Sequence, residues 1–186
     1  MPVTQLDDRT ALVVIDLQKG LTGFPTAHPF GDIVTKTARL AAAFRKNGMP
    51  VVLVNVTGMA PGRTDAARFN FEFPPDWADL IPELAKQESD HLVTKQRWGA
   101  FLGTGLDEYL RKEGVTQIVL TGVATSIGVE STARSAYDLG YNVALAVDAM
   151  TDMQLDAHNY CLENIFPRLG ETGLTEDILK LLNAAK

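Results

Sequence analysis

Three polar features stand where apolar runs typical of strands come to an end. Asp16 follows the run ALVVI, Lys95 follows HLVT, and the turn Thr121–Gly128 follows QIVL. A carboxylic acid can donate a proton, a lysine ammonium stabilises negative charge, and the N–H groups of a turn that begins a helix attract anions. Because the carboxyl ends of parallel strands meet at one edge of a sheet, we expect these features to share a site.

Asp148 is a fourth polar residue of this kind, because it follows the apolar run VALAV. Each of these residues also has a structural interpretation, since a polar side chain at a strand end can cap a helix or form a buried ion pair. The recurrence of the pattern favours a functional site.

Apolar runs alternate along the chain with amphipathic stretches of helical period. The runs predict strands at 11–15, 51–56, 91–94, 117–120 and 143–147, and the stretches predict helices at 33–47, from 104, and at 126–139, 156–166 and 175–185. Strands that are apolar on both faces and alternate with helices are typical of a parallel sheet covered on both sides. The sequence therefore predicts an α/β fold, a Rossmann-like three-layer αβα sandwich with a doubly wound parallel sheet, in a single domain spanning 1–186.

Composition excludes several classes of function. The 186 residues contain 17 Lys and Arg against 23 Asp and Glu, a net charge of −6, which disfavours binding to nucleic acid or to anionic membranes. No apolar run approaches the length of a membrane span, and the first residues do not resemble a secretory signal, so we expect a cytoplasmic protein with a small-molecule substrate. The one cysteine excludes an internal disulfide and a cysteine-rich zinc site.

Four segments resemble the isochorismatase-like hydrolase family, also called the cysteine hydrolase superfamily. They are ALVVIDLQK (11–19), TKQRWGAF (94–101), TGVATSIGVESTAR (121–134) and AYDLGYNVALAVDA (136–149). They occur in the family's order, and together they are far more specific than a lone glycine motif. The resemblance implies a parallel sheet with helices on both faces and a hydrolytic activity.

The best-known members of this family use an Asp-Lys-Cys triad. The resemblance places the aspartate at Asp16 and the lysine at Lys95, but the position of the nucleophilic cysteine is occupied by Gly128. Glycine has no side chain that can attack a substrate, so a thioester mechanism is not expected. True isochorismatases of the family also have a small residue there, and they cleave a vinyl ether to release pyruvate. By this resemblance Asp16 is the general acid, and Lys95 positions it or stabilises developing charge.

The turn before Gly128 is expected to bind substrate. The resemblance places a cis peptide bond at Val123–Ala124, and the start of a helix there could direct the N–H groups of Ala124 and Gly128 at an oxyanion or a carboxylate. The alternative for Gly128 is that glycine only permits close packing.

Substrate specificity is expected to come from the loops after the strands. Arginines in the irregular segment 58–75 could pair with substrate carboxylates, and Trp98 could wall an apolar pocket. The candidates are Phe24, His28, Arg63, Arg68, Arg97 and Trp98. The family's metal-binding members carry an Asp/His/His set after the second strand, and no histidine occurs in 55–76, so we predict no metal and no cofactor.

Two other functions remain open. One is a catalytically silent family member that binds a metabolite or serves in assembly, and the other is an amide (C–N) hydrolase with an unconventional nucleophile. We expect Cys161, in the predicted helix 156–166, to be a buried structural thiol. Family members commonly form dimers or larger assemblies, so a homo-oligomer is expected, with apolar residues of 69–77 and 165–173 as contact surfaces.

Overall fold

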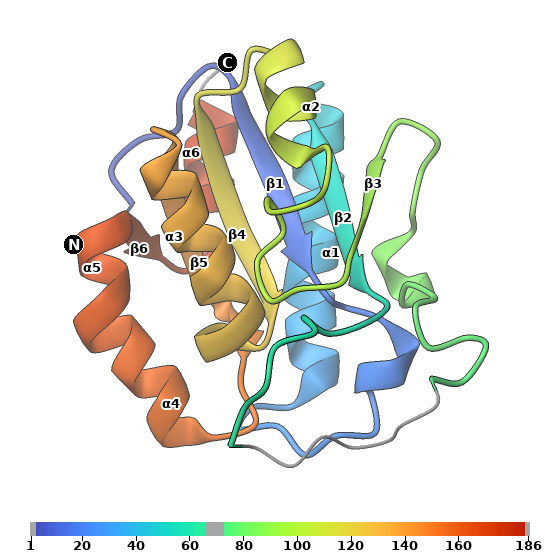
Figure 1. The fold of residues 1–186 in the computed structure, drawn as a ribbon. Coiled ribbons are helices and arrows are strands. Elements are labelled where there is room, and N and C mark those ends of the chain that lie inside the picture. Colours follow the sequence, from blue (N-terminus) through green and yellow to red (C-terminus); the bar gives the residue numbers. More distant parts are fainter. Residues whose placement is uncertain (1–2, 66–72, 185–186) are drawn as a thin grey trace.

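The computed structural model describes residues 3–65 and 73–184 of the chain. At its centre is a six-stranded sheet in the order β3-β2-β1-β4-β5-β6, in which all neighbouring strands are parallel (Figure 1). The strands are β1 (Thr10–Ile15), β2 (Val51–Val56), β3 (His91–Lys95), β4 (Gln117–Val123), β5 (Asn142–Thr151) and β6 (Glu171–Gly173). This arrangement confirms the predicted α/β fold.

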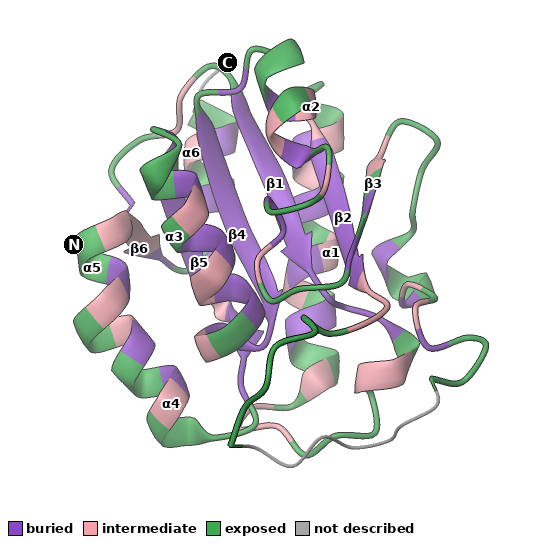
Figure 2. Cartoon of the chain, viewed as in Figure 1, coloured by how far each residue is buried: buried purple, intermediate pink, exposed green. Residues whose placement is uncertain are grey.

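Helices cover both faces of the sheet. α1 (Phe30–Lys46) and α6 (Thr175–Ala184) pack on one face, and α2 (Leu106–Lys112) and α3 (Glu130–Asp138) pack on the other. The remaining helical elements are η1 (Lys19–Leu21), η2 (Pro82–Leu84), η3 (Thr125–Val129), α4 (Leu155–Tyr160), η4 (Cys161–Ile165) and α5 (Phe166–Leu169). In Figure 2 the central strands are buried almost throughout, which explains their apolar sequences.

The order of the strands reverses direction at the centre of the sheet. From β1 the chain builds outward through β2 and β3, and then it returns to place β4 on the other side of β1. Ligands of open α/β sheets bind beyond the carboxyl ends of the strands at such a reversal. Asp16 follows β1 and η3 follows β4, so the topology brings two of the predicted features to this point.

The boundaries of some elements differ from the prediction. The short edge strand β6 was not predicted, because three residues carry no usable pattern, and the helix predicted from 126 begins with the π-helical turn η3. β5 continues to Thr151, so Asp148 lies within it instead of after it. Asp148 accepts hydrogen bonds from the N–H and the hydroxyl of Thr175 and pairs with Lys36, and it thereby anchors α6 instead of joining the site.

Among the residues that the structure describes, no helix has both the length and the apolar character needed to cross a membrane.

Candidate functional site

Asp16 ends β1 with an unusual backbone conformation. Its φ of 52° lies in the left-handed region, which is uncommon for a residue other than glycine. Its N–H still donates to the Val54 carbonyl at 3.0 Å, and its side chain is almost completely buried. The chain therefore turns away from the sheet at Asp16 while the carboxyl group stays inside the protein.

Lys95 is the last residue of β3 and contacts Asp16 across the end of β2. The Lys95 side chain is 2% exposed, and its Nζ lies 2.7 Å from Asp16 Oδ2 and 3.1 Å from the carbonyl oxygen of Arg97. The structure thus brings together two predicted site residues that are 79 positions apart in the sequence. They form a buried ion pair. Burying two charges carries a large desolvation cost, which only close contact between the charges can offset.

The two carboxyl oxygens of Asp16 differ in their surroundings. Oδ2 contacts Lys95, whereas Oδ1 is buried and has no hydrogen-bond partner in the described part of the chain. Burial raises the pKa of Asp16 to about 6, and the charge of Lys95 offsets only part of this rise. Burial therefore has a larger effect on the pKa of Asp16 than the Lys95 cation has, and Asp16 can carry a proton close to neutral pH.

Gly128 lies directly against this ion pair. It belongs to η3, which follows a cis peptide bond between Val123 and Ala124, as the family resemblance implied. A Cβ atom at position 128 would lie 2.9 Å from Ile15 Cγ2 and 3.3 Å from Asp16 Oδ2. Any side chain there would push on its neighbours, so glycine lets the turn pack onto the carboxyl group of Asp16.

Two further predicted substrate contacts lie in the same turn. Val123 is 1% exposed and Ala124 is 7% exposed, and the carbonyl of Ala124 accepts hydrogen bonds from the N–H groups of Ile127 and Val129. These two residues come just before η3, which contains Gly128. The turn is therefore adjacent to Asp16, and whether its N–H groups meet substrate stays a prediction.

The predicted specificity residues lie in exposed loops. Trp98 is 64% exposed, Arg63 is exposed, and Phe24 packs edge-to-face on Trp77 with 6.3 Å between ring centroids. Phe24 and Trp77 line a hollow of about 580 Å³, together with Lys19 and Asp76. Arg68 lies outside the described residues.

Sequence reasoning missed two polar residues, Asp152 and His158, that hold the turn before Gly128. The carboxylate of Asp152, just after β5, accepts hydrogen bonds of 2.7 Å from both the N–H and the hydroxyl of Ser126. Thr125 Oγ1 lies 2.8 Å from His158 Nδ1. Asp152 is also a polar residue at a strand end, and it would have been recognised if β5 had been predicted to continue to Thr151.

Cys161 is a buried thiol, as predicted. It is 1% exposed and its Sγ lies 3.0 Å from Glu130 Oε2. Burial and the neighbouring Glu130 raise the pKa of the thiol to about 12. Because the thiolate is the nucleophilic form of cysteine, this residue has the properties of a structural group.

Two apolar residues that were predicted to be exposed at contact surfaces are buried, and the assembly itself stays a prediction. Trp77 is 8% exposed because its ring covers Gly20 and its Nε1 donates to the carbonyl of Val56. Phe166 is fully buried in the core beside Cys161. Residues 69–72 of the first segment lie outside the described residues.

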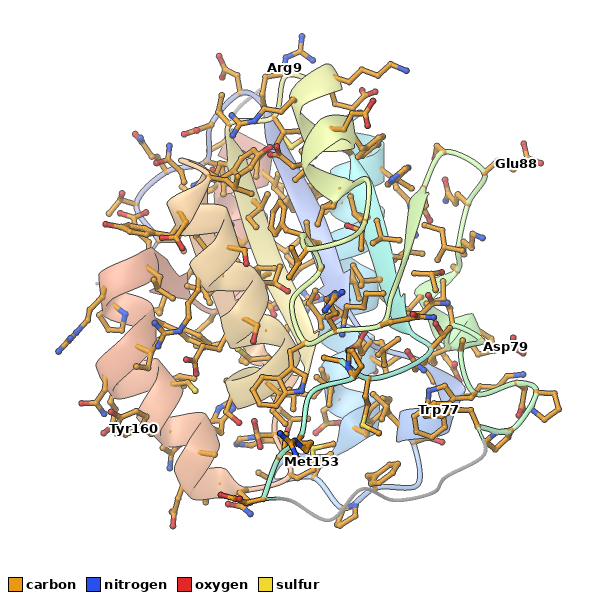
Figure 3. All side chains as sticks on the ribbon, viewed as in Figure 1. Arg9, Trp77, Asp79, Glu88, Met153 and Tyr160 are labelled. Carbon is orange, nitrogen blue, oxygen red and sulfur yellow. The ribbon has the colours of Figure 1, made fainter. Side chains whose placement is uncertain are left out.

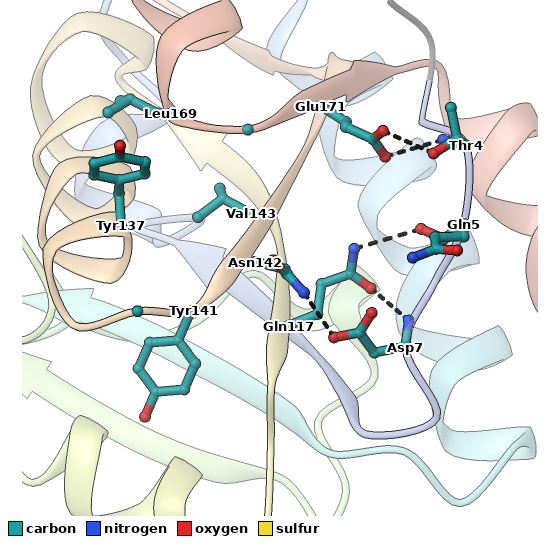
Figure 4. Close-up of a pocket in the computed structure, with 12 residues that line it drawn as sticks. Thr4, Gln5, Asp7, Gln117, Tyr137, Tyr141, Asn142, Val143, Leu169 and Glu171 are labelled. Atoms are coloured by element: carbon teal, nitrogen blue, oxygen red, sulfur yellow. Dashed lines mark hydrogen bonds between the residues drawn. The ribbon is translucent and has the colours of Figure 1, made fainter.

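A separate pocket lies at the other end of the strands, near the amino ends of β4 and β5. Figure 3 labels Arg9, next to the amino end of β1, and Met153, beyond the carboxyl end of β5, at opposite ends of the molecule. The pocket has a volume of about 430 Å³ and is lined by Gln117 and Asn142, which begin β4 and β5 (Figure 4). Its polar side chains bond mainly to one another: Gln117 accepts from the Asp7 N–H, and Asn142 donates to the Asp7 carboxylate.

No group of three or more His, Cys, Asp or Glu side chains within residues 3–65 and 73–184 could hold a metal ion.

Known proteins resemble this chain in both sequence and fold. The isochorismatase domain family matches residues 10–177. The uncharacterized isochorismatase family protein YwoC of Bacillus subtilis (strain 168) is 42% identical over 179 residues, which is 92% of this chain and 93% of the relative. An isochorismatase family protein from Burkholderia thailandensis has a solved structure that superposes with a TM-score of 0.93 at 42% identity, covering 96% of this chain and 98% of the other.

Some of the similar proteins have named activities. The isochorismatase of Bacillus subtilis (strain 168) is 30% identical over 185 residues, covering 96% of this chain and 59% of the relative. The ureidoacrylate amidohydrolase RutB of Variovorax paradoxus (strain S110) is 30% identical over 175 residues, covering 77% of this chain and 69% of the relative. With the family match and the 42% identical relatives, these similarities show that the chain belongs to the isochorismatase family of hydrolases.

Proposed function

We propose that this protein hydrolyses the vinyl ether of a small metabolite of the isochorismate type, with Asp16 as the general acid and without a covalent intermediate. One observation carries the proposal. Asp16 has one buried carboxyl oxygen without a partner in the described part of the chain, its other oxygen contacts Lys95, and its pKa is raised to about 6. A carboxyl group that is protonated close to neutral pH suits general acid catalysis.

The reaction begins with transfer of the Asp16 proton to the terminal CH2 carbon of the enol ether. The electron pair of the C=C bond forms the new C–H bond and leaves an oxocarbenium cation at the ether carbon. The resulting Asp16 carboxylate stabilises this cation and accepts a proton from the water that attacks it. The hemiketal then breaks the C–O bond to the rest of the metabolite: protonated Asp16 donates its proton to the departing oxygen and takes up the proton of the hemiketal hydroxyl group. Pyruvate and an alcohol are released, and Asp16 is left protonated for the next turnover.

Lys95 acts on Asp16 and not on the substrate in this scheme. Its Nζ lies 2.7 Å from Oδ2, which fixes the carboxyl group and leaves Oδ1 as the oxygen available to carry the proton. It also favours the carboxylate that forms after proton transfer. We propose that Val123, Ala124 and Gly128 form the wall on the other side, and that Phe24, Arg63 and Trp98 contact the rest of the substrate.

Amide hydrolysis is the second candidate function, and the similarity to RutB favours it. In this family it would need a nucleophile at position 128, where this chain has glycine. Cys161 is protonated and almost fully buried, so it does not supply one. A catalytically silent protein is disfavoured by the contact between Asp16 and Lys95, because an ion pair that no reaction uses would only add a desolvation cost.

The decisive experiment is a substrate panel on the wild-type protein beside Asp16→Asn. Pyruvate release from isochorismate, reduced by roughly 10²–10⁴-fold in Asp16→Asn, is the expected result. Ammonia release from amides would favour the second function. Thermal stabilisation by a panel compound without turnover would indicate a silent binding protein.

We also propose that the protein is a homo-oligomer. Trp98, Leu102 and Met59 are each more than 60% exposed, and apolar surface of this kind is common at contacts between subunits. A monomeric mass by light scattering would contradict this proposal.

A further inference from the structure

The residues that cover Asp16 are held by contacts outside the Asp16–Lys95 pair. η3 and the preceding Ala124 run from the end of β4 across the carboxyl end of β1, and Gly128 packs against Asp16 Oδ2. η3 is therefore one part of the cover that shields Asp16 from water.

We propose that Asp152 and His158 are positioning residues of this site, which fasten η3 over the carboxyl group of Asp16. This inference rests on the proposed acid role of Asp16. Two consecutive residues of the turn, Thr125 and Ser126, are held from two different places in the fold. Ser126 is bound by the loop after β5, and Thr125 is bound by α4.

Asp152 is itself held in place. It is 3% exposed, and its Oδ2 accepts two hydrogen bonds from Ser126 while its Oδ1 accepts one from the N–H of Gln154. Its own carbonyl accepts a hydrogen bond of 2.8 Å from the N–H of Ala27. Hydrogen bonds to a carboxylate are stronger than those between neutral groups, so the Asp152 side chain holds η3 firmly to the end of β5. Its backbone carbonyl attaches the loop before α1 to the same residue.

His158 makes the second attachment. It is 3% exposed and faces the buried hydroxyl of Thr125 at 2.8 Å. Burial and the neighbouring His28 lower the pKa of His158, while Asp152 acts in the opposite direction. The His28 ring packs on it with 4.7 Å between centroids, and the backbone N–H of His28 donates to the Thr151 hydroxyl at 3.0 Å. A neutral imidazole in this position is a fixed hydrogen-bond partner for Thr125.

These attachments have a consequence for the chemistry of Asp16. Burial is the largest cause of the raised pKa of its carboxyl group, and Lys95 is the charged group that opposes it. If η3 is loosened, water reaches the carboxyl group and the pKa of Asp16 falls toward the value of an exposed aspartate. Asp152 and His158 would then affect the pKa of Asp16 without contacting the substrate.

The test measures the titration of Asp16 directly, by the ¹³Cγ chemical shift of its carboxyl group as a function of pH, in the absence of substrate. Thr125→Val removes the hydroxyl that faces His158, and Thr125→Ser keeps it. Asp152→Asn removes one of the acceptor oxygens, and Asp156→Asn makes the same change at an exposed aspartate of α4.

We expect Thr125→Val and Asp152→Asn to lower the pKa of Asp16 by about one unit, and the two controls to leave it unchanged. An unchanged Asp16 titration in folded Thr125→Val and Asp152→Asn overturns the proposal. If those variants do not fold, Ser126→Ala decides, because it removes one hydrogen bond to Asp152 and keeps the N–H bond. A titration that does not move in Ser126→Ala then overturns the proposal.

This readout is independent of the proposed activity. If no vinyl ether is hydrolysed but the titration shifts as expected, the acid role fails and the positioning role stands. If pyruvate is released but the titration does not shift, the opposite holds.

Discussion

Lys95 Nζ lies 2.7 Å from Asp16 Oδ2, with side chains only 2% and 7% exposed, while Oδ1 of the same carboxyl group has no partner in the described part of the chain. Lys95 therefore fixes the orientation of the carboxyl group through Oδ2, while Oδ1 is available to carry the proton. It also explains why a cation in direct contact does not abolish acidity near neutral pH, because burial has the larger effect on the carboxyl group.

The rate should depend on pH through Asp16. A general acid must be protonated in the free enzyme, and the pKa of Asp16 is raised to about 6. We therefore expect kcat/KM to be constant at lower pH and to fall roughly tenfold per unit once the pH exceeds about 6. A steady-state profile on an active substrate measures this. A rate that rises with pH through this range would point to Asp16 as a base.

Lys95→Met should raise the pKa of Asp16 further. The substitution removes the cation that lowers this pKa and leaves the carboxyl group just as buried. The expected rise is about one unit or more, measured by the ¹³Cγ shift of Asp16 against pH. Lys112→Met is the matched control, because Lys112 is exposed on α2. A pKa that falls in Lys95→Met would contradict the ion pair.

Gly128→Ala should damage both stability and activity. The added Cβ would lie 2.9 Å from Ile15 Cγ2 and 3.3 Å from Asp16 Oδ2, so the turn or the carboxyl group must move. Overpacking of this kind costs about 1–3 kcal/mol of unfolding free energy. Displacement of the acid by a fraction of an ångström should lower kcat, by up to about 10²-fold.

Gly31→Ala is the control for that substitution. A Cβ at Gly31 in α1 meets nothing within 4 Å, so the change should stabilise the protein by about 0.5–1 kcal/mol. Thermal denaturation and turnover of the two variants can be compared side by side. Equal behaviour of Gly31→Ala and Gly128→Ala would show that position 128 has room for a side chain.

Cys161→Ala should leave activity intact. The thiol is buried, its pKa is raised to about 12, and it contacts Glu130 in the core beside α3. Loss of the sulfur should cost roughly 1 kcal/mol of unfolding free energy, as for other deletions of one buried heavy atom. Turnover by the variant and by the iodoacetamide-treated wild type should both match the untreated protein. A large loss of turnover in Cys161→Ala at unchanged stability would favour the amide hydrolase function.

The architecture, and the meeting of Asp16 with Lys95, could be predicted from the sequence. The run ALVVI is apolar at every position and VVLVNV is apolar at every position except Asn55, a pattern typical of a sheet buried on both faces, and this predicted the parallel layers. Asp16 and Lys95 stand at strand ends, and parallel strands bring such residues to one edge. The resemblance placed Gly128 and the cis peptide bond in the same turn.

The remaining features depend on contacts between elements that are distant in the sequence. Whether burial or Lys95 sets the pKa of Asp16 depends on how closely the carboxyl group is covered, and no local pattern encodes that coverage. Asp148 and Asp152 are four residues apart, yet one anchors α6 and the other holds Ser126, because β5 extends further than its apolar run. The contact between Thr125 and His158 joins residues 33 positions apart. Such pairings arise from the packing of α4 near the end of β4, and packing between distant elements has no signature in the sequence of either one.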